Sequence, residues 1–361
     1  MRLGAIAALL LAVVMACGPV LAQAVPEYPG QTLPKDMPRW MEGTPGDRVV
    51  GGSDAPFWRD VRRGDQGYVS IPNKAAGTLV QSGGESWRNF RNGPYRTWAG
   101  YIILGTVALL SLFFALRGRI PIEEGRAGYR IERFAVFERF VHWMTACCFI
   151  VLAVTGVNIV FGRYLLMPLL GKELFASITA WGKLAHDFLG FGFMVGIVLM
   201  FALWLRHNIP NRTDLVWLAE GGGMVGGGHP PAGKFNAGQK LIFWAVVLGG
   251  LSLSLSGLQL IFPFTFGFFD SAPRVLGHLG LDLPASISPM AEQQLATVWH
   301  GSMAMFMIAV MIAHVYIGTL GMEGAFEAMG SGKVDLNWAR EHHDLWVEEL
   351  EDKGEIRVPA E

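Results

Sequence analysis

Charged residues and cysteines are both scarce in this chain of 361 residues. Charged residues make up 16% of the chain, whereas soluble proteins contain about 25%. The net charge is −1, so the chain has no overall basic excess with which to bind nucleic acid. Hydrophobic residues instead account for 52% of the chain. This balance indicates a helical protein that lies in membrane lipid.

The chain has only three cysteines, and their positions exclude two kinds of metal chemistry. No Cys-x-x-Cys-His sequence occurs, so covalent attachment of a c-type haem is not expected. Cys147 and Cys148 are adjacent within an apolar segment, and Cys17 lies in an apolar leader. Buried thiols in such places are most simply packing residues, and no cluster bound by thiolates is expected.

Residues 1–24 predict a secretory signal peptide. A charged start, Met-Arg-Leu, precedes an apolar run over residues 4–16, and small residues then provide a cleavage site after Ala24. The apolar run is shorter than the roughly 20 residues that a membrane span needs. An uncleaved first membrane helix is one alternative. A lipoprotein cysteine at Cys17 is another, although Met15 fits that pattern poorly.

Five apolar runs, each near the length of a membrane span, follow an exported, loop-rich segment over residues 25–97. They cover residues 98–116, 140–161, 181–205, 241–262 and 300–320. They must be helices, because backbone amides exposed to lipid have no water to bind. The sequence therefore predicts an all-α membrane protein. One extra N-terminal transmembrane helix, 98–116, precedes a four-helix bundle over residues 130–322, and residues 323–361 form a tail.

Basic residues gather in the loops that the signal peptide would place inside a bacterial cell. These are Arg117, Arg119, Arg126, Arg130, Arg133, Arg206, Arg212, Lys234 and Lys240. The loops assigned to the outside have fewer, namely Arg163, Lys172, Lys183 and Arg274. Because cytoplasmic loops carry an excess of Lys and Arg, both signals place the N-terminal segment in the periplasm and the tail in the cytoplasm. We therefore expect a multi-pass protein of the bacterial inner membrane.

Four histidines lie inside or at the ends of the apolar runs: His142, His186, His300 and His314. Ionisable side chains in lipid usually mark function, and neutral imidazole is a common axial ligand of haem iron. In the predicted topology His142 and His314 lie toward the inner side, and His186 and His300 toward the outer side. A single histidine of this kind would more simply be a packing residue. The matched depths instead predict an inner and an outer b-type haem.

The fifth apolar run would contribute a ligand to each haem. His300 and His314 are fourteen residues apart, which corresponds to about 21 Å along a helix and almost four turns. Both side chains therefore point to similar faces of one helix, at opposite leaflets of the membrane.

A polar stretch, residues 234–240, precedes the fourth apolar run on the inner side. Its residues Asn236 and Gln239 carry hydrogen-bond donors and acceptors, and Gly238 allows close approach of the backbone. Such a stretch can bind the two carbonyl oxygens of a quinone. From composition alone an ordinary interfacial loop is the favoured interpretation.

The tail combines aromatic and histidine residues with many acidic neighbours. Trp338, His342, His343 and Trp346 lie well beyond the last apolar run. The pattern predicts an amphipathic, solvated helix or a docking surface for a partner.

Over residues 130–349 the sequence resembles the gamma subunit of membrane-bound formate dehydrogenase. This is the cytochrome b556 family, related to the b-type subunits of nickel–iron hydrogenases. The stretch 234–240 and the two adjacent histidines of the tail favour the formate dehydrogenase branch. The resemblance is carried by Phe137-Glu138-Arg139-Phe140-Val141-His142-Trp143, Leu184-Ala185-His186, Arg206-His207-Asn208-Ile209-Pro210, Asp214, Trp217, residues 234–240, the His300/His314 spacing, Gly332-Lys333-Val334 and Trp338-Ala339-Arg340-Glu341-His342-His343.

The resemblance implies two haem b groups with the pairing given above. It also implies a quinone, menaquinone or ubiquinone, bound near the inner haem by Asn236, Gly238 and Gln239, which reverses the interpretation of that stretch. Electrons would come from an iron–sulfur (beta) subunit. Formate would be oxidised on a separate catalytic (alpha) subunit with molybdenum or tungsten, because this chain has no ligand set for those metals and no catalytic residues for formate oxidation.

The first 120 residues have no counterpart in the compact members of that family. Two alternatives stay open from the sequence. One is the cytochrome b subunit of a hydrogenase or a thiosulfate reductase. The other is a haem-free membrane tether whose histidines only pack.

Overall fold

The computed structural model describes residues 84–223, 228–269 and 289–356. The predicted signal peptide, 1–24, and residues 25–83 of the predicted exported segment lie outside the described residues. The described chain divides into two compact units. The smaller unit contains residues 84–95, 258–269 and 289–299, and the larger unit contains residues 96–223, 228–257 and 300–356.

Within the described residues, five helices are long and apolar enough to cross a membrane, as the sequence predicted. Three of them begin well before the predicted runs, the first at Ser86 instead of residue 98. The fifth helix starts at Pro289, eleven residues before His300, and the third starts at Lys172, fourteen residues before His186. These two histidines therefore lie inside helices and not at their ends. The five helices are Ser86–Arg117, Val136–Leu165, Lys172–His207, Ala237–Ile261 and Pro289–Gly321.

The prediction of a loop over residues 84–97 is wrong, because these residues are helical. Helix α4 (Gly84–Phe90) and the π-helix η2 (Arg91–Tyr95) lead directly into α5 (Arg96–Arg117). The sequence conceals this start because polar and basic residues interrupt the apolar pattern there. In the smaller unit, Trp87 and Phe90 pack against Leu295 and Val298.

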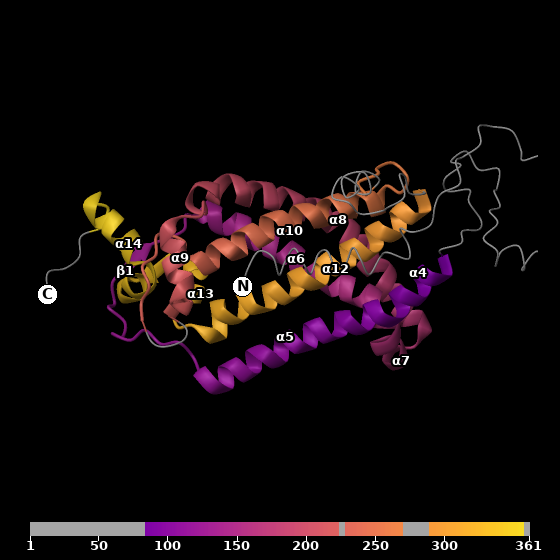
Figure 1. The fold of residues 1–361 in the computed structure, drawn as a ribbon, viewed down its shortest axis with the longest axis horizontal. Helices are drawn as coiled ribbons and strands as arrows, with labels where there is room; N and C mark the ends of the chain where they lie inside the picture. The colour runs from indigo at the N-terminus through magenta and orange to yellow at the C-terminus, as the bar shows by residue number, and fades with distance from the viewer. Residues whose placement is uncertain (1–83, 224–227, 270–288, 357–361) are drawn as a thin grey trace, which may run out of the picture. The chain divides into compact units, whose positions relative to one another are not determined.

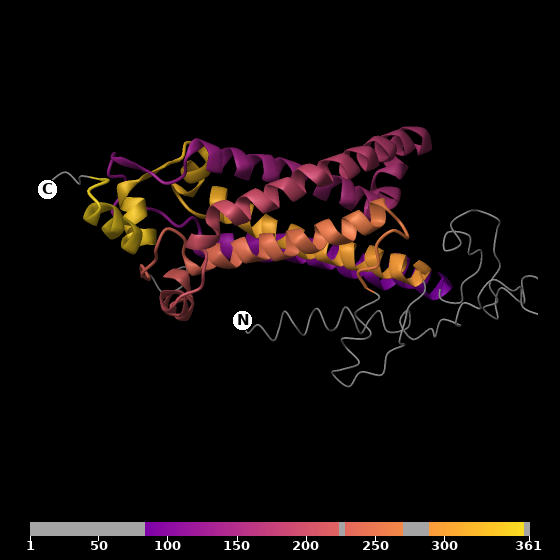
Figure 2. The same ribbon diagram turned by 90° about the horizontal axis from the view of Figure 1, so that it is seen from above.

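The larger unit has the remaining elements, and its long helices lie alongside one another (Figures 1 and 2). Two long helices, α10 (Ala237–Ile261) and α12 (Pro289–Tyr316), have some residues assigned to each unit. The other elements of the larger unit are β1 (Arg130–Glu132), α6 (Val136–Leu165), α7 (Met167–Leu170), α8 (Lys172–Trp204), the 3₁₀-helix η3 (Leu205–His207), α9 (Arg212–Ala219), the 3₁₀-helix η4 (Gly221–Gly223), the π-helix η5 (Ile317–Gly321), α13 (Ala325–Gly330), β2 (Lys333–Asp335) and α14 (Leu336–Asp352).

Glycines allow neighbouring helices of the larger unit to approach closely. A Cβ atom added at Gly249 of α10 would lie 2.5 Å from the sulfur of Met307 in α12. One added at Gly196 of α8 would lie 3.0 Å from the Cβ of Thr145 in α6. Small residues have this role at helix contacts in membranes, because van der Waals packing replaces the hydrophobic effect as the driving force.

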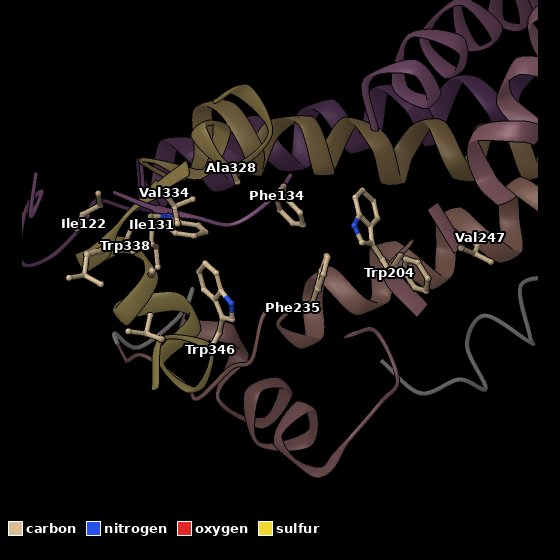
Figure 3. Packing of buried hydrophobic residues seen from close by; sticks show 14 residues of the cluster. Ile122, Ile131, Phe134, Trp204, Phe235, Val247, Ala328, Val334, Trp338 and Trp346 are labelled. Carbon is tan, nitrogen blue, oxygen red and sulfur yellow. The ribbon is translucent and has the colours of Figure 1, made fainter. Parts of the chain in front are cut away.

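A hydrophobic core lies where α6 begins and α8 ends (Figure 3). Trp338 and Trp346 of α14 are buried in it together with Phe134, Trp204 and Phe235. The tail is therefore not the solvated helix that its acidic residues suggested, because the aromatic face of α14 packs against the membrane helices. A short antiparallel sheet of β1 and β2, which the all-α expectation did not include, joins the tail to the start of the bundle.

Acidic residues of the tail bind the backbone of the segment that follows α5. Asp335 accepts hydrogen bonds from the amides of Ala127 and Gly128, at 3.1 and 3.2 Å. Glu341 accepts from the amides of Glu123 and Glu124, at 3.1 and 3.0 Å. Such charge-assisted bonds are stronger than neutral ones, so the acidic character of the tail serves its docking.

Candidate functional site

The four histidines form two pairs in the larger unit, with the partners that their predicted depths indicated. The rings of His142 (α6) and His314 (α12) have centroids 6.3 Å apart, with an interplanar angle of 59°. The rings of His186 (α8) and His300 (α12) have centroids 6.2 Å apart, with an interplanar angle of 61°. Helix α12 contributes one histidine to each pair, because it is continuous through both positions.

The spacing of each pair fits two axial ligands of one iron. Imidazole–metal bonds are about 2.0–2.1 Å long and a ring nitrogen lies about 1.1 Å from its ring centre, so two rings on opposite sides of one iron have centroids about 6 Å apart. Both observed spacings match this value. Among the described residues no group of three or more His, Cys, Asp or Glu residues is arranged to hold a metal ion. The pairs thus suit a metal whose other ligands come from a macrocycle.

The two pairs are named by their predicted sides, the outer pair being His186 and His300 and the inner pair His142 and His314. Hydroxyl groups hold both histidines of the outer pair. The Nδ1 atom of His186 lies 2.8 Å from the hydroxyl of Thr155, on α6. The Nδ1 atom of His300 lies 2.9 Å from the hydroxyl of Ser256, on α10. Gly156 and Gly257, next to these hydroxyl residues, lie against the same rings, and a Cβ at Gly257 would be 3.3 Å from the Cε1 atom of His300.

The hydroxyl contacts favour one tautomer of both outer histidines. Thr155 donates its proton to the carbonyl of Val151 at 2.7 Å, and Ser256 donates to that of Ser252 at 2.8 Å. Each hydroxyl oxygen can therefore accept a hydrogen bond from the Nδ1–H group of the histidine tautomer that carries its proton there. The Nε2 lone pair of each ring is then available to a metal, which is the arrangement that metal-binding histidines usually have.

The inner pair, His142 and His314, lacks such partners among the described residues. The Nδ1 atom of His142 is buried without a hydrogen-bond partner there. The ring of His142 has an edge-on contact with Trp143, at 5.3 Å between centroids. A buried polar atom without a partner is unusual in native proteins and points to a bound group or water that satisfies it.

Asn236 and Gln239, the predicted quinone residues, cap the start of α10. The side-chain oxygen of Asn236 accepts from the amide of Gln239 at 2.9 Å, and the side-chain oxygen of Gln239 accepts from the amide of Asn236 at 3.1 Å. This reciprocal pattern is a capping box, which satisfies two free amides of the first helical turn. Both carboxamide oxygens are thus used by the cap, and the NH₂ groups are what these side chains offer to a ligand.

Gly238 supports the same cap through packing. A Cβ atom added there would lie 2.9 Å from the Cη2 atom of Trp217, on α9. The neighbouring Lys240 forms a buried ion pair with Asp214 at 2.9 Å, which also ties α9 to α10. The stretch 234–240 and the Asp214/Trp217 positions therefore meet in space.

The capping residues lie close to the level of the inner histidine pair. Gly249 faces Met307, and Gly257 faces His300, so α10 and α12 run antiparallel with residue 242 level with His314. Gln239 is three residues further along, which is about 4.5 Å of helix rise.

Arg133 is a neighbour of this site that the sequence analysis counted only as a basic loop residue. Its side chain is 3% exposed and donates to the carbonyl of Lys234 at 2.5 Å and to the side-chain oxygen of Gln239 at 3.4 Å. Its guanidinium lies over the rings of Trp338 and Trp346. Burial lowers the pKa of Arg133 to about 9. Its position just before the second apolar run was the only signal in the sequence.

Thr155 and Ser256 were also missed by the sequence analysis. Hydroxyl residues are common in apolar helices, where they bond to the preceding turn. Only the register between α6 and α8, and between α10 and α12, shows that these two face histidines.

Comparison with known proteins finds one matching family and several relatives. A family model described as prokaryotic cytochrome b561 matches residues 133–332. The nitrate-inducible formate dehydrogenase cytochrome b556(Fdn) subunit of Escherichia coli K12 is 26% identical over 234 residues, which cover 64% of this chain and 96% of that protein. The cytochrome b556(fdo) subunit of the same strain is 30% identical over 222 residues, covering 61% and 93%. A Haemophilus influenzae cytochrome b556 subunit is 27% identical over 225 residues, covering 61% and 83%.

Proposed function

The chain belongs to the prokaryotic cytochrome b561 family and, within it, to the group of formate dehydrogenase cytochrome b556 subunits. From this premise we propose that it is the membrane subunit that accepts electrons from an iron–sulfur partner and delivers them through two haem b groups to a quinone. It is a multi-pass membrane protein with five apolar helices. Formate would be oxidised on another subunit.

His142 and His314 would hold one haem, and His186 and His300 the other. When bound, each haem supplies one-electron chemistry at its iron. The protein holds each group with two helices, so the ligands cannot approach or separate without movement of packed backbone. The hydroxyls of Thr155 and Ser256 would hold the outer pair in place and favour the tautomer that presents Nε2 to an iron.

Quinone would bind where α10 begins, beside the inner histidine pair. The NH₂ groups of Asn236 and Gln239 are donors suited to quinone carbonyl oxygens. Gly238 leaves room beside Trp217 for the close packing of that turn. The buried guanidinium of Arg133 lies against Gln239 and favours negative charge that develops on the bound ring.

We propose an orientation from the distribution of basic residues. Arg117, Arg126 and Arg133 precede α6 at the end of the bundle where α14 docks, which we assign to the cytoplasm with the stretch 234–240. Protons for quinone reduction would then enter from the cytoplasm. A cysteine introduced at Glu355 should react with an impermeant reagent only in inverted membrane vesicles, and labelling from the periplasm of intact spheroplasts would refute this orientation.

The 6.2–6.3 Å spacing of both histidine pairs is the observation that carries the proposal. The test is a reduced-minus-oxidised absorption spectrum of the purified chain, with haem measured against protein. We expect b-type bands and two haems for each chain. A colourless protein would instead identify a haem-free tether, and one haem would refute one of the two pairs.

A further inference from the structure

We propose that Thr155 and Ser256 lower the midpoint potential of the haem that the outer pair, His186 and His300, would hold. The inference rests on the proposed function, because it concerns the residues that would hold the two haems. It assigns to two neutral hydroxyl groups a role in setting the potential of that haem.

The hydroxyl oxygens of Thr155 and Ser256 are acceptors in their hydrogen bonds with the outer histidines. The hydroxyl protons of Thr155 and Ser256 are donated to backbone carbonyls of their own helices, at 2.7 and 2.8 Å. Their oxygens can then only accept from the histidine Nδ1–H groups, at 2.8 and 2.9 Å. Both outer imidazoles therefore share their proton with an acceptor.

An acceptor at Nδ1 changes how strongly the histidine donates electrons to a bound iron. A histidine that donates its other ring N–H to an acceptor becomes a more basic ligand. A more basic ligand stabilises ferric iron relative to ferrous iron, because the oxidised ion carries the greater charge. Two such ligands on one iron therefore lower its midpoint potential, and hydrogen bonding of this kind is one of the means by which proteins adjust haem potentials.

No hydroxyl of the described residues is hydrogen-bonded to His142 or His314, whereas both outer histidines have one. Removal of either hydroxyl is therefore expected to act on the outer haem alone.

The test replaces each hydroxyl without changing the shape of the helix. Thr155→Val and Ser256→Ala should each raise the midpoint potential of one haem in a spectroelectrochemical titration of the purified chain, and leave the other haem unchanged. The haem that moves should be the one that is lost in His186→Ala. Thr155→Ser and Ser256→Thr, which keep the hydroxyl, should return the potential toward that of the unmodified chain.

Two matched controls lie on the same helices. Thr145 of α6 donates to the carbonyl of Val141 at 2.7 Å, and Ser254 of α10 donates to that of Gly250 at 2.7 Å, but neither hydroxyl is hydrogen-bonded to a histidine of the described residues. Thr145→Val and Ser254→Ala should therefore leave both potentials unchanged.

The haem affinity provides a second measurement. Loss of a supporting hydrogen bond typically weakens metal binding by about 10–100-fold. Selective weakening or loss of the outer haem in Thr155→Val, with the inner haem retained, supports the proposal. Unchanged potentials and affinity in both hydroxyl variants, or a shift confined to the inner haem, would overturn it. A parent chain that binds no haem would overturn the proposed function as well.

Discussion

At the scale of single residues, the side chains proposed to bind ligands also have structural contacts. Asn236 and Gln239 each use an oxygen to cap α10, while His186 and His300 each use one nitrogen to hold a hydroxyl. A substitution that removes a whole side chain therefore changes two things at once. Variants that keep one contact and remove the other are the informative ones.

Asn236→Ser separates capping from quinone binding. Serine caps helices about as well as asparagine but has no NH₂ group, so only the donor to the quinone is lost. We expect quinone reduction to slow by about two- to tenfold, the worth of one hydrogen bond, with both haems still reducible and the melting temperature unchanged. Asn236→Ala should additionally lose about 1 kcal/mol of stability through the cap. Unchanged quinone kinetics in both variants would show that the stretch is only a structural cap.

The protonation of His342 and His343 should control the docking of α14. Burial lowers the pKa of His342 to about 4, an effect strengthened by His229 and Arg133 and opposed by Glu123. Burial also lowers the pKa of His343 well below 6.5, again together with Arg133. Because both folded pKa values lie below the unfolded value, the docked state is fully stable above about pH 6.5 and loses stability as the pH falls toward 4.

Hydrogen–deuterium exchange of α14 tests this, once intrinsic exchange rates have been corrected. Protection should fall between pH 7 and pH 5, and His342→Gln should reduce the pH dependence. Protection that stays constant over this range would show that these histidines become charged without undocking the helix.

At the scale of elements, the apolar helices could be predicted from the sequence, whereas the tail could not. Runs such as 140–161 identify a helix because lipid leaves no other structure for them. The helix start at Pro289 was missed because polar residues of the first turns, Glu292 among them, interrupt the apolar pattern there. The burial of Trp338 and Trp346 depends on a core formed with Phe134 and Trp204, and no local pattern contains such distant contacts.

The attachment of the tail requires a glycine at position 332. Its φ angle is +85°, and an added Cβ would lie 2.6 Å from the carbonyl oxygen of Phe134. Gly332→Ala should therefore undock the tail and make it sensitive to limited proteolysis. Gly354 provides a matched control, because its φ angle is +66° and no atom lies within 4 Å of the added Cβ. Gly354→Ala should lower the free energy of unfolding by only about 1–2 kcal/mol, which is the cost of a left-handed conformation for an L-residue. Equal protease resistance of the two variants would contradict the role of Gly332.

At the scale of the whole molecule, the depth of each histidine was enough to predict which histidines meet. His142 with His314, and His186 with His300, followed from topology because helices in a membrane hold their residues at defined depths. The hydroxyl partners did not follow, because depth does not determine which face of α6 or α10 points at a neighbouring histidine. Arg133 was not predicted either, since its burial depends on the docked tail.

Haem quantitation in single and double histidine variants tests the central claim most directly. His186→Ala and His300→Ala should each leave one haem, and the double variant of this pair should still leave one, because both residues would hold the same iron. A double variant across the pairs, His142→Ala with His186→Ala, should leave none. Two haems in any single variant, or no haem in the double variant within the outer pair, would contradict the assignment.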